Sequence, residues 1–128
     1  MPGPTILVVD DNPVNLRLVE FILSKQGYTV RTASSSFVAL DVLEKSCVDL
    51  VLLDIQMPEL DGIELARRLR SNPETREIPI VALSGHALSS DATASCAEFD
   101  HYLAKPVERT QLGEVVERLL HARAQRPS

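Results

Sequence analysis

The strongest constraint on this chain is an alternation of short apolar runs with stretches whose apolar residues recur at helical spacing. Five runs have the length and composition of strands, and a predicted helix follows each of them. Because right-handed crossovers carry such a chain back over the sheet, the alternation predicts a parallel sheet with helices on both faces. The predicted strands cover residues 5–10, 28–33, 49–54, 78–84 and 101–105.

Each predicted helix has one apolar face, which we expect to pack on the sheet. Asn12 and Pro13 start the first helix as its cap and first-turn residue, and Gly27 ends it. The helix over 88–98 has the weakest pattern, because Ser and Thr are poor helix-interior residues. The residues expected to face inward are, helix by helix, Val14, Leu18, Phe21 and Ile22; Ala39, Val42 and Leu43; Ile63, Ala66 and Leu69; Leu88, Ala92 and Cys96; and Leu112, Val115, Val116, Leu119 and Leu120.

Composition narrows the class of protein. The chain has 128 residues, 45% of them hydrophobic and 24% charged, which fits one globular domain. Its net charge of -5 argues against nucleic acid as a direct partner, because phosphate binding needs a basic surface. No apolar run is long enough for a membrane span, the first residues lack a signal-peptide pattern, and Cys47 and Cys96 lack zinc-site spacing. We therefore expect a cytoplasmic protein with free thiols.

Acidic residues close two of the predicted strands, at the edge where parallel α/β sheets bind polar ligands. Asp10 and Asp11 end the first strand, and Asp54 ends the third. If these strands are neighbours, three carboxylates meet, and two like charges about 4 Å apart repel by roughly 4 kcal/mol at an effective dielectric of about 20. A hard divalent cation such as Mg²⁺ would offset this repulsion. The alternative is that these acids only cap the following helices.

Two further polar residues close later strands. Ser84 ends the fourth predicted strand and Lys105 ends the fifth. Beside an acidic pocket, the lysine can neutralise a phosphoryl oxygen as a point charge, and the serine can donate its hydroxyl. Taken alone, the lysine is more simply a solvated rim charge and the serine a turn residue. Nucleotide binding lacks support, because neither a Walker-type loop nor a G-x-G-x-x-G segment follows a strand.

Four motifs at these strand ends give the chain a resemblance to the receiver domains of two-component response regulators. They are VDDN at 9–12, LDIQMPELDG at 53–62, ALS at 82–84 and YLAKP at 102–106. Each motif is weak alone, whereas all four in this order are specific. The resemblance covers essentially the whole chain. It implies a flavodoxin-like three-layer α/β sandwich, a (βα)5 doubly wound five-stranded parallel sheet in strand order 2-1-3-4-5, with the receiver domain at 1–122 and a polar tail at 123–128.

The resemblance also implies a metal site and a phosphoacceptor. Asp54 is the expected phosphoacceptor and nucleophile. Mg²⁺ is expected to bind Asp11 and Asp54 directly, with the backbone carbonyl of Gln56 as a third ligand and Asp10 acting through water.

Other positions of the family pattern carry catalytic and switching roles. Ser84 and Lys105 are expected to hold the phosphoryl oxygens as catalytic partners of the acceptor. Ser84 and Tyr102 match the family's switch residues, and Tyr102 is expected to turn inward in the active state. Gln56 and His86 occupy the two variable positions that tune the lifetime of the aspartyl-phosphate in this family.

The implied function is a phosphorelay switch. The chain is expected to take a phosphoryl group from a phosphohistidine on a sensor histidine kinase or a histidine phosphotransfer protein. A downstream protein is expected to bind the fourth helix, fifth strand and fifth helix, and phosphorylation-dependent dimerisation is left open. Beyond self-phosphorylation from small phosphodonors and self-dephosphorylation, no enzymatic activity is expected.

Two alternatives come from other functional classes. A Mg²⁺-dependent phosphatase of the haloacid-dehalogenase type also uses an aspartate nucleophile. The pattern of that family has a D-x-D motif on its first strand, whereas this chain has the adjacent residues Asp10 and Asp11. A degenerate receiver that works without phosphorylation requires a lost acceptor or lysine, and both Asp54 and Lys105 are present. The sequence leaves open whether the receiver is free-standing or belongs to a hybrid kinase.

Overall fold

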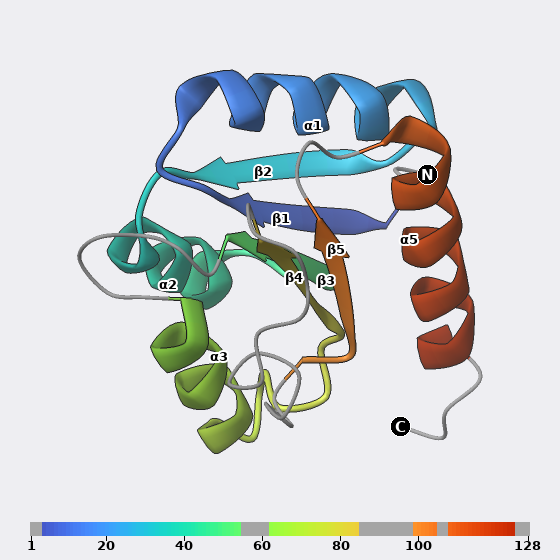
Figure 1. Cartoon of the computed structure of the whole chain (residues 1–128). Helices are drawn as coiled ribbons and strands as arrows, with labels where there is room; N and C mark the ends of the chain where they lie inside the picture. Colours follow the sequence, from blue (N-terminus) through green and yellow to red (C-terminus); the bar gives the residue numbers. More distant parts are fainter. Residues whose placement is uncertain (1–3, 55–61, 85–98, 105–107, 125–128) are drawn as a thin grey trace.

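The computed structural model, which describes residues 4–54, 62–84, 99–104 and 108–124, is a three-layer α/β sandwich (Figure 1). Five parallel strands form one sheet in the order β2-β1-β3-β4-β5, which confirms the predicted flavodoxin-like topology. The predicted helix over 88–98 lies outside the described residues. In chain order the elements are β1 (Thr5–Val9), α1 (Pro13–Lys25), β2 (Thr29–Ala33), α2 (Ser36–Lys45), β3 (Leu50–Asp54), α3 (Gly62–Ser71), β4 (Ile80–Ser84), β5 (His101–Ala104) and α5 (Arg109–Ala124).

The sheet is buried on both faces, as its continuous apolar strands require. Successive residues of a strand point to opposite faces, so each central strand contributes to two cores. On one face, Leu7 and Leu53 pack with residues from α2 and α3. On the other face, Ile6 and Leu52 pack with residues from α1 and α5. The two helical layers therefore enclose β1, β3 and β4, while β2 and β5 form the edges.

The start and end of α1 follow the predicted signals. The Asn12 side-chain oxygen accepts hydrogen bonds from the backbone N–H groups of Val14 (2.9 Å) and Asn15 (3.4 Å), which caps the helix. Gly27, beyond the end of α1, has a φ of 95°. This left-handed conformation costs glycine little and explains why the chain turns there into β2.

The predicted inward face of α1 is wrong. Val14, Leu18 and Phe21 are 71%, 45% and 59% exposed. Of the four predicted residues only Ile22 is buried, and it packs with Val19 and Leu23 on residues of β1, β3 and α5. The reason is that α1 carries apolar residues on two adjacent faces, and periodicity alone does not specify which face the sheet covers.

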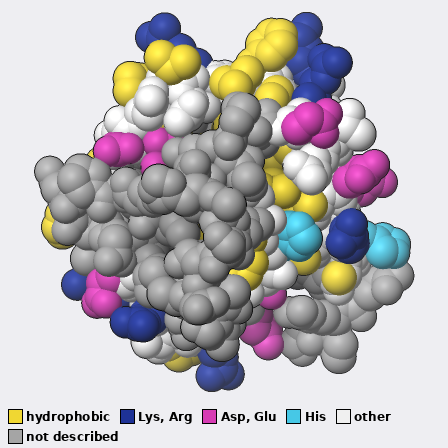
Figure 2. Space-filling model, viewed as in Figure 1, with side chains coloured by type: hydrophobic (Ala, Val, Ile, Leu, Met, Phe, Trp, Pro, Cys, Tyr) yellow, Lys and Arg dark blue, Asp and Glu magenta, His cyan; other side chains and the backbone are white. Residues whose placement is uncertain are grey.

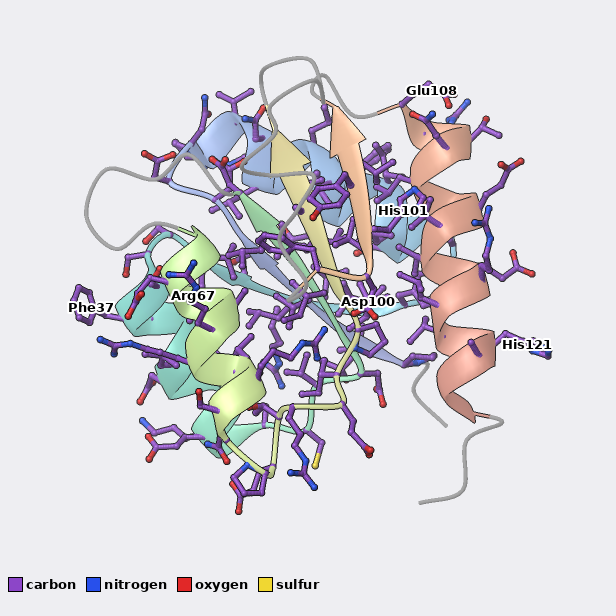
Figure 3. The ribbon with its side chains drawn as sticks, turned by 60° about the horizontal axis from the view of Figure 1, so that its bottom comes forward. Phe37, Arg67, Asp100, His101, Glu108 and His121 are labelled. Carbon is purple, nitrogen blue, oxygen red and sulfur yellow. The ribbon has the colours of Figure 1, made fainter. Side chains whose placement is uncertain are left out.

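In the other helices of the described part of the chain, the predicted inward residues whose side chains are described face the sheet, and the side chain of Ile63 in α3 lies outside that description. Ala39 of α2 is buried, and Val42 and Leu43 are partly buried against the same core. Phe37, at the start of α2, projects away from the core, as Figure 3 shows. The inward residues of the later helices are Ala66 and Leu69 in α3, and Leu112, Val115, Val116, Leu119 and Leu120 in α5. Within the described segments, no helix combines the length and the apolar character of a membrane span.

Candidate functional site

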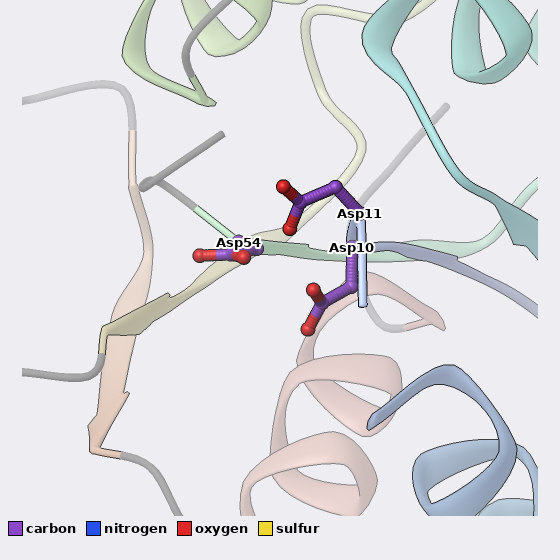
Figure 4. A group of neighbouring side chains, drawn as sticks. All are labelled: Asp10, Asp11 and Asp54. Carbon is purple, nitrogen blue, oxygen red and sulfur yellow. The ribbon is translucent and has the colours of Figure 1, made fainter. Parts of the chain in front are cut away.

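Three carboxylates meet at the carboxyl edge of the sheet. Asp54 ends β3, and Asp10 and Asp11 directly follow β1. These strands are hydrogen-bonded neighbours, and Val9 lies opposite Leu53 in the register. Consequently one ligand atom from each of Asp10, Asp11 and Asp54 lies within 4.8 Å of the others, and Figure 4 shows the three side chains together. We call this group the acidic cluster.

The acidic cluster is closed on its inner side and open on its outer side. Asp10 is 1% exposed and Asp54 is 2% exposed, whereas Asp11 is exposed to solvent. The cluster thus combines two buried carboxylates with a third that solvent reaches. This arrangement gives a ligand from solution a route to oxygen atoms that are otherwise hidden.

The turn between β1 and α1 fixes the carboxylate of Asp10. Its Oδ1 atom accepts a hydrogen bond from the backbone N–H of Asn12 at 2.9 Å. Its own backbone N–H donates to the carbonyl oxygen of Ala33 at 3.1 Å, which ties the turn to the end of β2. Since Asn12 also caps α1, the acidic cluster and the first turn of that helix share one set of hydrogen bonds.

The chemistry of the acidic cluster fits a hard divalent cation. The ligand atoms lie within 4.8 Å of one another, and at that outer limit each pair of carboxylate charges repels by ~3.5 kcal/mol at an effective dielectric of about 20. A cation between the three groups converts this repulsion into attraction. All the donor atoms are carboxylate oxygens, the ligands that Mg²⁺ prefers, and Mg²⁺ typically uses only one or two protein carboxylates and fills the rest of its shell with water and phosphate oxygens.

The backbone brings Ser84 to the same edge of the sheet. Asp54 lies opposite Leu83 in the register of β3 and β4, so Ser84 follows one residue beyond the partner of Asp54. Ser84 in turn lies opposite Ala104, the last residue of β5. Gln56, His86 and Lys105, the remaining predicted site residues, lie outside the described residues.

Tyr102 is half-buried on β5 and packs on the core shared with α2 and α3. The ring of Phe99 contacts it edge to face, with centroids 5.6 Å apart and an interplanar angle of 64°. Phe99 is not among the site residues predicted from the sequence. The available signal was its position, an aromatic residue directly before the last strand and three residues from the predicted switch residue.

Hydrophobic side chains remain exposed on α1, near the acidic cluster. Val14, Leu18 and Phe21 recur at helical spacing on its outer face, and we call them the α1 stripe. Figure 2 shows hydrophobic side chains gathered at the top of the molecule, over α1, with basic side chains beside them. Because the helix starts directly after Asp11 and Asn12, the α1 stripe begins close to the open side of the cluster.

Two pKa shifts mark residues away from the acidic cluster. Burial and, secondarily, the charge of Glu117 raise the pKa of Tyr28 above its usual 10.0. Hydrogen bonds from the backbone N–H groups of Gln111 and Thr110 lower the pKa of Glu108 below 4.5, because they stabilise the carboxylate form. Glu108 therefore acts as a charged cap at the start of α5.

Comparisons with known proteins agree with this geometry. The model of the response regulator receiver domain family matches residues 6–117. Sensor histidine kinase GacS of Pseudomonas protegens is 38% identical over 118 residues, which cover 89% of this chain but only 13% of that kinase. An uncharacterized 14.6 kDa protein of Leptolyngbya boryana is 38% identical over 113 residues, covering 88% of this chain and 86% of that protein.

A solved structure extends the similarity to three dimensions. The receiver domain of sensor histidine kinase PA1611 from Pseudomonas aeruginosa PAO1, solved with a magnesium ion coordinated in its active-site cleft, has a TM-score of 0.84 to this chain. The two are 34% identical, over 93% of this chain and 98% of that one.

Proposed function

The chain belongs to the family of response regulator receiver domains, and on this premise we propose that it accepts a phosphoryl group on Asp54 from a phosphohistidine and thereby switches its partner-binding surface. The observation that carries the proposal is the acidic cluster, in which the buried Asp54 lies within 4.8 Å of both Asp10 and the solvent-exposed Asp11. Three carboxylates so close together are costly in an isolated fold and useful around a metal ion and a phosphoryl group.

In this proposal Asp11 and Asp54 bind Mg²⁺ directly, the carbonyl oxygen of Gln56 is a third ligand, and Asp10 acts through water. The hydrogen bond from the backbone N–H of Asn12 supports the indirect role, because it already occupies one oxygen of the Asp10 carboxylate. When bound, Mg²⁺ supplies positive charge that neutralises the phosphoryl oxygens and the acceptor.

Asp54 is the nucleophile of the proposed transfer. One of its carboxylate oxygens forms a bond to phosphorus while the bond between phosphorus and the donor's imidazole nitrogen breaks, and the imidazole leaves with that electron pair. Lys105 and Ser84 hold the phosphoryl oxygens, and Gln56 and His86 tune how long the acyl phosphate lasts. Burial of the cluster's inner side limits the access of water that would hydrolyse this product.

The proposed donor is the phosphohistidine of a sensor histidine kinase or a histidine phosphotransfer protein. A donor protein whose phosphohistidine reaches Asp54 must contact the surface beside the acidic cluster. The exposed apolar α1 stripe begins on that surface. We therefore assign the α1 stripe to the donor's docking surface. This assignment gives Val14, Leu18 and Phe21 a role that core packing does not provide.

The proposed output surface consists of β5, α5 and the helix predicted over residues 88–98, and a downstream protein binds it after Ser84 and Tyr102 rearrange. In this proposal residues 1–122 form the receiver domain, and residues 123–128 form a polar C-terminal tail. The proposed location of the protein is the cytoplasm. Dimerisation on phosphorylation is an outcome to be tested by light scattering of the modified protein.

The proposal is tested by intact-protein mass after incubation with acetyl phosphate, with and without Mg²⁺, beside the Asp54→Asn variant. We expect a gain of one phosphoryl group that needs Mg²⁺ and is absent from the variant. Phosphoryl label on Asp54→Asn would refute the acceptor assignment. If no mass gain appears, a titration with beryllium fluoride, which mimics the phosphoryl group, separates two explanations. It should bind a site whose phosphorylated product is short-lived, and it should not bind a site that is unreactive.

A further inference from the structure

A network of hydrogen bonds fixes the backbone at the start of β5, at the end of the sheet opposite the acidic cluster. The Arg70 guanidinium donates through Nη1 to the carbonyl oxygens of Arg76 (2.6 Å) and Ile78 (2.7 Å), and through Nη2 to Asp100 Oδ2 (2.7 Å). The same Asp100 oxygen accepts from the backbone N–H of Ile80 at 2.8 Å. Figure 3 labels Asp100 at this position, at the start of β5.

Asp100 is therefore bonded to β4 through both its side chain and its backbone. Its own N–H donates to the carbonyl oxygen of Ile80 at 2.8 Å, so Asp100 and Ile80 exchange two hydrogen bonds. Arg70 adds a link to the end of α3. The residue directly before this anchor is Phe99, whose backbone position is set by it.

Phe99 is 8% exposed and belongs to the core on the α2 and α3 face. Its ring meets Tyr102 edge to face, a geometry that aromatic pairs favour. Tyr102 lies opposite Ala82 in the register of β4, and Ser84 follows two positions later on that strand. The half-buried Tyr102 ring therefore contacts the Phe99 ring. On the neighbouring strand it lies opposite Ala82, whose side chain is small.

We propose that Phe99, anchored by the Arg70–Asp100 ion pair, is a positioning residue that holds Tyr102 in its half-buried orientation and so sets how readily phosphorylation switches the domain. The inference rests on the proposed function, because it assigns Tyr102 a part in the switch. The contact exists only while the Tyr102 ring lies against the core. Its loss therefore lowers the population of that orientation relative to one in which the ring points to solvent.

The chain offers a direct probe, since it has two tyrosines and no tryptophan. A Tyr28→Phe background leaves Tyr102 as the sole tyrosine, so its emission and its quenching by acrylamide report on this ring alone. On that background we compare Phe99→Leu with Phe37→Leu, the same change at a phenylalanine that is 61% exposed on α2. Each protein is measured with Mg²⁺ alone and through a titration with beryllium fluoride.

We expect Phe99→Leu to increase quenching of Tyr102 and to raise the half-saturating beryllium fluoride concentration about threefold to tenfold, while Phe37→Leu changes neither. Asp100→Asn, which removes the ion pair and keeps Phe99, should shift both readouts in the same direction and serves as the test if Phe99→Leu does not fold. Equal quenching and equal titrations for the Phe99→Leu and Phe37→Leu proteins would overturn the inference. If the background protein neither binds beryllium fluoride nor gains phosphoryl mass, the proposed function fails, and the inference fails with it.

Discussion

Replacing Asp54 with Asn should stabilise the metal-free domain, although it removes the proposed acceptor. The Asp54 ligand atom lies within 4.8 Å of those of Asp10 and Asp11, and at that outer limit each repulsion amounts to ~3.5 kcal/mol at an effective dielectric of about 20. Solvent around the exposed Asp11 reduces its share towards ~1 kcal/mol. Against this relief of repulsion, an amide accepts hydrogen bonds less strongly than a carboxylate does. We therefore expect the free energy of unfolding to rise by about 1–3 kcal/mol.

The assay is urea unfolding followed by circular dichroism, in chelator and in saturating Mg²⁺. With a slope of about 1–3 kcal/mol per molar urea, the expected gain raises the unfolding midpoint in chelator by roughly 1 M. Mg²⁺ at about a hundred times its dissociation constant should stabilise the native chain by ~2.7 kcal/mol and the variant by less. The difference between the unfolding midpoints of the two proteins should therefore narrow or change sign when Mg²⁺ is added.

The matched control is Asp41→Asn, which removes an aspartate charge on the exposed face of α2, where Asp41 pairs with Lys45 at 3.0 Å. It should cost a few tenths of a kcal/mol and leave the response to Mg²⁺ unchanged. The reasoning is refuted if Asp54→Asn is less stable than the native chain in chelator, or if Mg²⁺ stabilises both proteins equally.

Four further predictions follow from other contacts. Arg70→Ala should lower the free energy of unfolding by about 2 kcal/mol in urea titrations, since it removes a half-buried ion pair and two bonds to carbonyl oxygens; a loss below about 0.5 kcal/mol would contradict this. Glu108→Ala should lower the melting temperature at pH 7, and the difference should vanish as the pH falls below 4.5, because a lowered carboxyl pKa stabilises the fold only above that range; a constant difference would argue against the cap. Tyr28 has a raised pKa, so native stability should fall as the pH rises above 10.0 and Tyr28→Phe should reduce that fall in alkaline melting curves. Phe21→Ser should slow transfer from a phosphohistidine donor but not from acetyl phosphate, with stability within about 0.5 kcal/mol of native; equal slowing with both donors would remove the α1 stripe from docking.

The sheet and its strand ends could be predicted because their signals are local and repeat along the chain. The continuous apolar runs of β1 and β3 indicate strands buried on both faces, and the acids that close them follow directly. Once the two strands are neighbours, the convergence of Asp10 and Asp54 is a consequence of parallel pairing. The motif pattern supplied the strand order, which the apolar runs alone leave open.

The rotation of α1 and the partner of Tyr102 could not be predicted, because both depend on tertiary contacts. Apolar residues on two faces of α1 allow two orientations, and the packing of Leu23 against β1, β3 and α5 selects one. Phe99 shows no pattern of its own in the sequence, since its role arises from the anchoring of Asp100 by a side chain from α3. Contacts between residues as distant in sequence as Arg70 and Asp100 leave no periodic signal.

The positions of strands in the sheet also determine which parts of the domain open first. β1, β3 and β4 have hydrogen-bonded neighbours on both sides, whereas β2 and β5 have one each. Backbone amides of the three inner strands should therefore exchange with deuterium last, after those of either edge. Asp10 and Asp54 are attached to these slowest-exchanging strands, and Tyr102 lies on an edge strand. The domain thus keeps its acidic cluster assembled during partial opening, while the strand that carries the proposed switch residue fluctuates at lower cost.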